Sequence, residues 1–216
     1  MNLDLTSDQL LSTTRAVRLR LDLDRPVPRH LLEECVDLAV QAPTGRNRQR
    51  WHFVIVTDED KRREVADIWR ASAAAPGDAE PLTARDVRRA NVASGRMARV
   101  GAGFAHLHAN LHRVPALVVP YVEGRTDGAS VERQAGTWGS ILPAVWSFML
   151  AARERGLGSC WTTGGLAYER ELSRALGVPY ERLMQAAFIP VAYTIGTEFR
   201  PARRVPRAEV LHWQGW

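Results

Sequence analysis

The 216-residue sequence has very little lysine and cysteine. Lys61 is the only lysine, so almost all of the positive charge is carried by arginine. Cys35 and Cys160 are the only cysteines, and each lies in an apolar segment, where a free thiol usually behaves as a small hydrophobic side chain. This pair of cysteines indicates no disulfide framework, and a reducing compartment is expected.

Long apolar runs and targeting signals are also missing. No uninterrupted apolar stretch reaches the roughly 18–20 residues that a membrane span needs. Residues 1–5 lack the basic region and the apolar stretch of a signal peptide. We therefore expect a cytoplasmic protein that does not enter a membrane.

The excess of positive charge is small and dispersed. Twenty-nine basic and 24 acidic residues give a net charge of +5, and many arginines alternate with acids, as in residues 60–64. A nucleic-acid surface requires a clustered basic stripe, preferably interleaved with exposed aromatic residues. No nucleic-acid partner is therefore expected, and with 45% hydrophobic residues the chain can bury the core of one medium-sized domain.

Several common catalytic and binding motifs are absent. Residues 101–106 and 156–161 each lack the third glycine of a dinucleotide-binding loop, and the sequence has neither a Walker loop nor a nucleophile elbow. His108 and His112 would share one helical face, but no third ligand follows at a useful distance. Hydrolase chemistry and a metal site are therefore not expected.

Apolar periodicity predicts alternating helices and strands in an α+β layered domain that spans residues 1–216. Ser7 is expected to cap a short first helix. Pro143 is expected in the first turn of a buried helix. We expect helices at residues 28–41, 59–75, 83–110, 140–155 and 168–176, and strands at residues 51–57, 116–121, 159–163 and 185–195.

Two further segments have no clear apolar pattern. Residues 70–113 include the weakly patterned helix expected at residues 83–110, whose three glycines indicate a break, and the segment is a candidate lid or substrate segment. The C-terminal extension, residues 197–216, carries four arginines and ends with Trp213 and Trp216. Such a tail is expected to pack on a second subunit.

Three separated segments combine arginine, hydroxyl or amide side chains with flexible backbone. They are residues 14–18 (TRAVR), residues 42–51 (APTGRNRQRW), and residues 161–164 (WTTG) together with Arg203 and Arg204. Arginine suits phosphate because its planar guanidinium group donates paired hydrogen bonds and stays charged. Amides and backbone groups offer the donors and acceptors that the edge of a flat heteroaromatic ring requires.

Together and in this order, these segments resemble the FMN-dependent nitroreductase family. Residues 14–18 resemble its N-terminal arginine motif, and residues 42–51 resemble its A-P-S-x-x-N-x-Q-P-W signature. Residues 156–161 (GLGSCW) match its G-L-G-x-x-W element, and the proline-flanked Arg203 and Arg204 resemble its C-terminal basic motif. The resemblance covers nearly the whole chain except residues 70–113. It implies a central mixed sheet flanked by helices, and a homodimer in which both subunits form each FMN site.

The resemblance also implies roles for individual residues. The phosphate would be held by Arg15, Arg18 and Arg204, with backbone from Thr14 and Ala16 and further charge from Arg203. The flavin would be approached from the partner subunit by Pro43, Thr44, Gly45 and Asn47. Trp161, Thr162 and Thr163 would line the isoalloxazine ring, and Arg46 would lie near the substrate. The cofactor itself performs this chemistry, so no catalytic acid, base or nucleophile is expected.

The sequence departs from the family pattern at three positions. Thr14 stands where an arginine is common, Ala16 where a serine is common, and Arg50 where proline is usual. The loss of one arginine and one hydroxyl group should weaken phosphate binding, and Arg203 is a candidate to compensate.

The expected activity is the reduction of a nitroaromatic, a quinone or a similar small acceptor by NADH or NADPH in alternating half-reactions. One alternative keeps the fold but makes the enzyme a dehalogenase or an enzyme that consumes the flavin. A second alternative is a basic nucleic-acid-binding or regulatory module without enzymatic activity. That module would be colourless and would bind with a steep dependence on salt.

Overall fold

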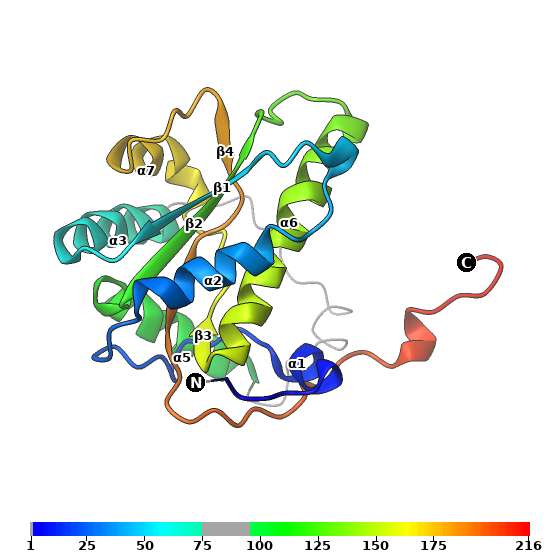
Figure 1. The fold of residues 1–216 in the computed structure, drawn as a ribbon, viewed down its shortest axis with the longest axis horizontal. Coiled ribbons are helices and arrows are strands. Elements are labelled where there is room, and N and C mark those ends of the chain that lie inside the picture. The colour runs from blue at the N-terminus through cyan, green and yellow to red at the C-terminus, as the bar shows by residue number, and fades with distance from the viewer. Residues whose placement is uncertain (1, 75–95) are drawn as a thin grey trace.

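The computed structural model describes residues 2–74 and 96–216, which fold around a five-stranded sheet. The strands are β1 (Trp51–Val56), β2 (Ala116–Glu123), β3 (Leu157–Ser159), β4 (Leu183–Gln185) and β5 (Ile189–Tyr193). The strand order is β1-β2-β5-β3, with β4 also paired to β2. The predicted α+β class is confirmed (Figure 1).

Strand direction differs from the mixed sheet that the resemblance implied. All four ladders are antiparallel, and the one parallel pairing in the described part of the chain is a bridge between Ala16 and Ser159. Strands β2 and β5 are nearly continuous apolar runs, a pattern common in parallel strands because helices cover both faces of their sheets. Here an antiparallel sheet is covered on both faces, so its strands show the same pattern.

Helices cover both faces of the sheet (Figure 1). Their bounds are α1 (Ser7–Thr13), α2 (Arg29–Ala39), α3 (Glu59–Ala74), α5 (Arg96–Asn110), α6 (Val131–Glu154) and α7 (Glu169–Ala175). Single 3-10 turns lie at Gly45–Asn47, Leu111–Arg113, Leu166–Tyr168 and Arg207–Glu209. On β2, Val118 and Val122 pack with α2 and α6, whereas Leu117, Val119 and Tyr121 pack with α3 and α7.

Helix α1 begins one residue away from the expected cap. Thr6, not Ser7, is the N-cap. The Gln9 amide donates to Thr6 Oγ1 at 3.2 Å, and the Thr6 amide donates back to Gln9 Oε1 at 2.9 Å. This reciprocal capping box fixes the helix start because both partners must lie three residues apart.

Helix α6 begins nine residues before the predicted start at residue 140. Its first turns are polar and contain glycine, so apolar periodicity does not reveal them, while Ser130 caps the helix by accepting from the Arg133 amide at 3.3 Å. Pro143 therefore lies inside the helix rather than in its first turn. Because proline has no amide proton, it cannot bond to the Gly139 carbonyl, and the helix loses one internal hydrogen bond there.

By length and composition, α6 could cross a membrane, the one such helix in the described residues. Its apolar face is buried inside the protein, where α6 packs on α2, β2 and β3. The buried residues on this face are Ile141, Ala144, Val145, Phe148, Met149, Ala151 and Ala152.

Other expected boundaries shift. The predicted strand at 185–195 is divided into β4 and β5, and the predicted strand at 159–163 is replaced by the earlier β3 and a bridge between Thr162 and Phe188. Of the predicted helix at 83–110, the part at Arg96–Asn110 is helix α5. Residues 75–95, which include the rest of this helix and part of the expected lid, lie outside the described residues.

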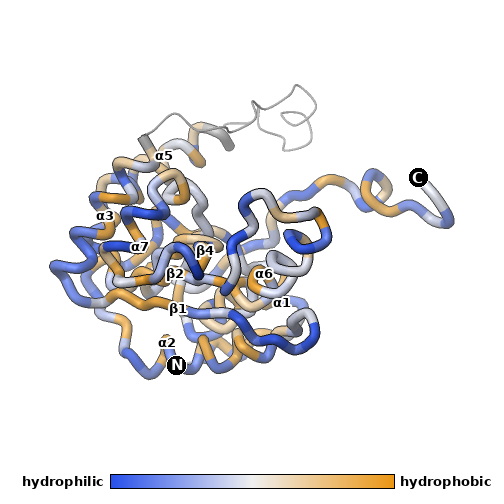
Figure 2. The backbone as a smooth tube through the Cα atoms, turned by 90° about the horizontal axis from the view of Figure 1, so that it is seen from above, coloured by the Kyte–Doolittle hydropathy of each residue, from blue (hydrophilic) through white to orange (hydrophobic). Residues whose placement is uncertain are grey.

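The C-terminal tail is attached at its root and then leaves the body (Figures 1 and 2). Arg20 donates to the carbonyls of Ile195, Gly196 and Glu198 at 2.8, 2.6 and 3.1 Å. Figure 2 shows apolar and polar segments alternating along the extended part. Trp213 and Trp216 are 77% and 102% exposed, so the chain's own fold does not cover them.

Candidate functional site

The N-terminal arginine segment runs beside β3. Ala16 pairs with Ser159, and the Val17 amide donates to the Ser159 carbonyl at 2.8 Å. Gly158 permits this approach, since a β-carbon there would lie 2.7 Å from Thr194 Cγ2 and 3.1 Å from Val17 Cβ. The G-L-G element thus holds residues 14–18 against the sheet.

Replacement of Gly158 by alanine should overpack this contact. We expect Gly158→Ala to destabilise the fold by about 1–3 kcal/mol, measured by urea unfolding. Gly101→Ala is the matched control, because a β-carbon at Gly101 would meet nothing within 4 Å and alanine favours the helix. Equal stability of Gly158→Ala and the wild type would contradict the close packing.

Arg15 faces a small pocket at the C-terminal end of α1. The pocket is partly open to solvent and has space for about one water-sized particle, about 10 Å³. Its polar lining residues are Thr13, Thr14, Arg15, Arg153 and Ser159. The Thr13 and Thr14 hydroxyl groups donate to the Gln9 and Leu10 carbonyls at 2.7 and 2.6 Å, so their protons are already used inside the protein. The guanidinium groups are the strongest donors near this pocket.

Arg18 has different neighbours. Its β- and δ-carbons approach Gly103 of α5, and its guanidinium lies beside Cys160. Burial raises the pKa of the Cys160 thiol, and the nearby Arg18 charge opposes this shift. The Nε atom of Arg18 is buried and has no hydrogen-bond partner within the described chain. A buried donor without a partner is unfavourable, so this atom is available to a ligand.

The segment after β3 is anchored through Thr162. Its hydroxyl donates to the Phe188 carbonyl at 2.8 Å and accepts from Trp69 Nε1 at 3.2 Å. Trp161 is half-buried, whereas Thr163 is exposed. Thr162 therefore fixes the backbone here, while Thr163 remains accessible.

The loop at residues 43–50 contains a cluster of unusual backbone angles. Arg46, Asn47 and Gln49 have φ values of 56°, 51° and 51°, in the left-handed region that few non-glycine residues adopt. The Gly45 amide donates to Ser140 Oγ at 3.2 Å, and the Gln49 amide donates to Thr44 Oγ1 at 3.1 Å. Such strained backbone is concentrated at ligand sites in many proteins.

This loop borders an open groove of about 410 Å³ at the N-terminal half of α6. Thr44, Gly45 and Arg46 line it together with Arg48, Arg50, Glu132, Arg133 and Ser140. Pro43 and Asn47 are exposed. Ser140 and Arg153 are 13 residues apart on α6, a rise of about 20 Å. One chain therefore holds its loop and its Arg15 pocket in separate places.

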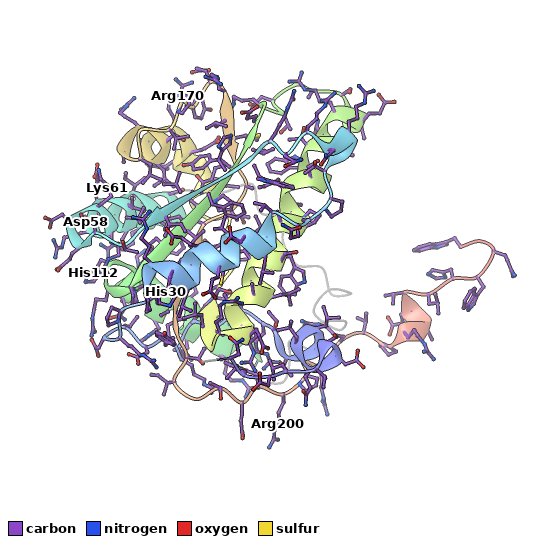
Figure 3. The ribbon with its side chains drawn as sticks, viewed as in Figure 1. His30, Asp58, Lys61, His112, Arg170 and Arg200 are labelled. Atoms are coloured by element: carbon purple, nitrogen blue, oxygen red, sulfur yellow. The ribbon has the colours of Figure 1, made fainter. Side chains whose placement is uncertain are left out.

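The remaining predicted phosphate ligands lie in the tail. Arg203 and Arg204 are exposed and make no hydrogen bond or ion pair with the rest of residues 2–74 and 96–216. At the tail root, Arg200 points away from the body (Figure 3). The structure thus brings Arg15, Ala16 and residues 161–163 to one region around β3, without Arg203, Arg204 or the loop.

Sequence reasoning missed Arg153, which lines the Arg15 pocket. It falls four residues after Met149 on the buried face of α6. An arginine at apolar spacing in a buried helix was the available signal, since arginine is almost never fully buried without a partner.

The profile of the nitroreductase family matches residues 11–193. The chain belongs to the nitroreductase family. This match includes β3 and the bridged segment at residues 14–18, the region where Arg15, Ala16 and residues 161–163 come together.

Individual relatives are similar to this nitroreductase-family chain over most of the length of both proteins. An NADH dehydrogenase of Thermus thermophilus is 28% identical over 206 residues, covering 88% of this chain and 87% of the relative. The structure of an FMN- and NADPH-dependent nitroreductase, NfnB of Sphigopyxis sp. strain HMH, has a TM-score of 0.75 and 26% identity, covering 98% of this chain and 100% of that one. An iodotyrosine deiodinase bound to FMN and 3-iodo-L-tyrosine shares the fold, with a TM-score of 0.66, 22% identity, and coverage of 96% and 97%.

His108 and His112, the histidines considered as metal ligands, have different surroundings in this nitroreductase-family chain. His112 lies near the α3 end of the molecule with Lys61 and Asp58 (Figure 3), and burial is the main cause that lowers its pKa. His108 packs against the Trp69 ring at 6.1 Å. No group of three or more potential metal ligands occurs in the described ranges.

Proposed function

We propose that this chain is an FMN-dependent oxidoreductase in which NADH or NADPH reduces the flavin and a small acceptor, such as a nitroaromatic or a quinone, reoxidises it. Family membership supports a flavin oxidoreductase. The observation that carries the proposal is the presence of buried guanidinium nitrogens that have no partner within residues 2–74 and 96–216. One is on Arg18, inside the bridged segment at residues 14–18, and two are on Arg153, which lines the pocket beside Arg15. A phosphate-bearing anion would satisfy such donors.

The residues fit FMN in their chemistry. Arg15 and Arg18 supply positive charge, and Ala16 and Thr163 are exposed residues that the cofactor can approach. Bound FMN would supply hydride and electron transfer, while the protein binds and orients it and restricts water. In this proposal Arg203 and Arg204 add to the phosphate site, Trp161, Thr162 and Thr163 line the ring, and Arg46 lies near the substrate.

A homodimer would complete the site. The separation of about 20 Å along α6 keeps the 43–47 loop away from the Arg15 pocket of its own chain, so we propose that the loop serves the partner's flavin. Helix α6 also exposes apolar side chains, with Val131, Leu142 and Trp146 exposed by 81%, 36% and 38%. Such surface is typical of a subunit interface.

The tail would pack on the partner, and the structure offers a matching groove. Strand β1 is an edge strand, and a groove of about 520 Å³ lies between it and α2. Its apolar lining includes Trp51, Phe53 and Val36. Of its charged lining residues, Glu33 already pairs with Arg29 at 2.7 Å, and Asp37 is opposite in charge to Arg207 of the tail. We propose that the end of the tail, residues 205–216, occupies this groove on the partner, beyond the Arg203 and Arg204 of the phosphate site.

Two alternatives remain for the reaction. One is dehalogenation, because the chain shares its fold with an iodotyrosine deiodinase. The other is a reaction that consumes the flavin. The colour of the purified protein separates all flavoenzymes from a nucleic-acid-binding module, which would be colourless. We further propose that residues 1–216 form one domain and act in the cytoplasm.

The proposed reaction requires both substrates to use one flavin site in turn. We expect NADH or NADPH to bleach the flavin absorbance under anaerobic conditions before any acceptor is added. Double-reciprocal plots of the steady-state rate against the NADH or NADPH concentration, measured at several acceptor concentrations, should then give parallel lines. Intersecting lines would show a ternary complex and contradict alternating half-reactions.

A further inference from the structure

Arg153 is a buried arginine at the end of α6. The residue is 5% exposed, and its guanidinium lies 4.9 Å from the centre of the Phe199 ring. Nη2 donates to the Thr197 carbonyl at 2.8 Å. Nε and Nη1 are both buried and have no partner in the part of the chain that the structure describes. Two donors of one buried cation are thus left without an acceptor.

The surrounding charges do not neutralise Arg153. Within residues 2–74 and 96–216 it forms no ion pair, and the nearby Glu154 carboxylate accepts from the amides of Asp4 and Leu5 at 2.7 and 3.3 Å. Burial lowers the pKa of Arg153, Glu154 opposes this shift, and the positive Arg20 adds to it. A buried charge without a counter-ion is costly unless a ligand supplies one.

Arg153 and Arg15 line the same pocket. This partly open pocket has space of about 10 Å³ for one water-sized particle, which corresponds to a single oxygen of an oxyanion rather than a whole phosphate. Arg15 is already a candidate phosphate ligand, and Thr14 stands where the family motif commonly has an arginine. At Thr14 the chain lacks one positive charge that the family motif commonly has. Arg153 brings one positive charge to the same pocket from α6.

We propose that Arg153 is an anion-binding residue that, together with Arg15, receives one oxygen of a phosphate group in this pocket. The inference rests on the proposed FMN function for its ligand, and it assigns to α6 the charge that is missing at Thr14. Because Arg153 also binds the Thr197 carbonyl, occupancy by the phosphate would fix the root of the tail that carries Arg203 and Arg204.

Flavin titration of the apoprotein tests this role. In Arg153→Met, FMN should bind about 10- to 100-fold more weakly, because a charge-assisted hydrogen bond is lost. Riboflavin, which lacks the phosphate, should bind the variant and the wild type with similar affinity. Flavin fluorescence gives both values without an activity assay. Arg174→Gln removes an exposed arginine of α7 and should behave like the wild type.

Inorganic phosphate provides a second readout that needs no flavin. It should raise the melting temperature of wild-type apoprotein and of Arg174→Gln, but not that of Arg153→Met. Without phosphate, Arg153→Met should melt no lower than the wild type, because an uncompensated buried charge is removed. If Arg153→Met does not fold, Arg153→Lys should keep the response to phosphate and Arg153→Gln should lose it.

Equal weakening of FMN and riboflavin, or an unchanged response to phosphate, would show that Arg153 only holds the tail root and would overturn the inference. If the wild type binds neither flavin, the proposed function fails. The phosphate-dependent melting of wild type and variant still decides whether the anion site exists.

Discussion

Removal of residues 200–216 is expected to convert a flavin-containing dimer into a folded monomer without flavin. In the proposed site the tail would contribute Arg203 and Arg204, and it exposes Trp213 and Trp216 by 77% and 102%. Burial of two such aromatic side chains on a partner would contribute several kcal/mol to association, at roughly 25 cal/mol per Å². The loss of this contact should therefore dissociate the subunits.

The structure also indicates where the truncation should begin. Phe199 packs against the buried core, and Arg20 stacks on its ring at 4.3 Å, so residues 195–199 belong to the folded body. A chain ending at Phe199 keeps these contacts. Size-exclusion chromatography with detection at flavin wavelengths gives mass and cofactor content together. A truncated dimer that retains FMN would contradict the role of the tail.

Two further variants test the tail and the groove separately. Replacement of both tail tryptophans by serine should weaken the dimer while leaving the tail arginines in place. Val36→Glu should have a similar effect from the groove side, since Val36 lines the space between α2 and β1. Dissociation by the tail variant alone would place the tail on another surface of the partner.

Charge reversal at Arg15 is expected to yield a folded protein that purifies almost free of flavin. Arg15 lines the pocket beside Arg153 and is only partly buried, so Arg15→Glu should be tolerated by the fold. Loss of one charge-assisted hydrogen bond costs about 1.5–3 kcal/mol, which weakens FMN binding about 10- to 100-fold in Arg15→Ala. Repulsion between the new carboxylate and the phosphate should weaken binding further in Arg15→Glu.

Arg18 offers a second test with a different structural context. Its Nε is buried and has no partner among the residues that the structure describes, and its guanidinium lies beside Cys160. Arg18→Gln, which keeps a polar side chain, is therefore preferable to charge reversal. FMN should bind this variant more weakly, measured by fluorescence titration, with circular dichroism to confirm folding. Arg174→Glu is the matched surface control. Wild-type affinity for FMN in both Arg15→Ala and Arg18→Gln would mean that these arginines are not cofactor ligands.

Most of the secondary structure could be predicted from the sequence because local periodicity encodes it. The prediction at residues 28–41 corresponds to α2, and the prediction at residues 51–57 corresponds to β1. The start of α6 could not be predicted in this way, since its first turns are polar and contain glycine. The cap of α1 at Thr6 required the reciprocal bonds with Gln9, which depend on the folded backbone.

The candidate site was only partly accessible to sequence reasoning. Motif order identified the family, which the family profile confirms. Motif order did not reveal that Arg15 and Arg18 have different neighbours, or that Arg46, Asn47 and Gln49 adopt left-handed backbone. These features depend on contacts with α5, α6 and β3, which are distant in sequence.

The sequence by itself determined the chemistry that this protein can offer: arginine-rich segments, a G-L-G turn and an aromatic tail, in an order shared with one family. The tertiary structure decided which arginine side chain is buried away from solvent. Arg153 is one of many arginines in the sequence, but the packing of α6 against β3 and the tail root removes it from solvent and leaves two of its nitrogens unpaired within the described part of the chain. The free energy of a charge depends on its surroundings more than on its identity, and long-range packing sets those surroundings.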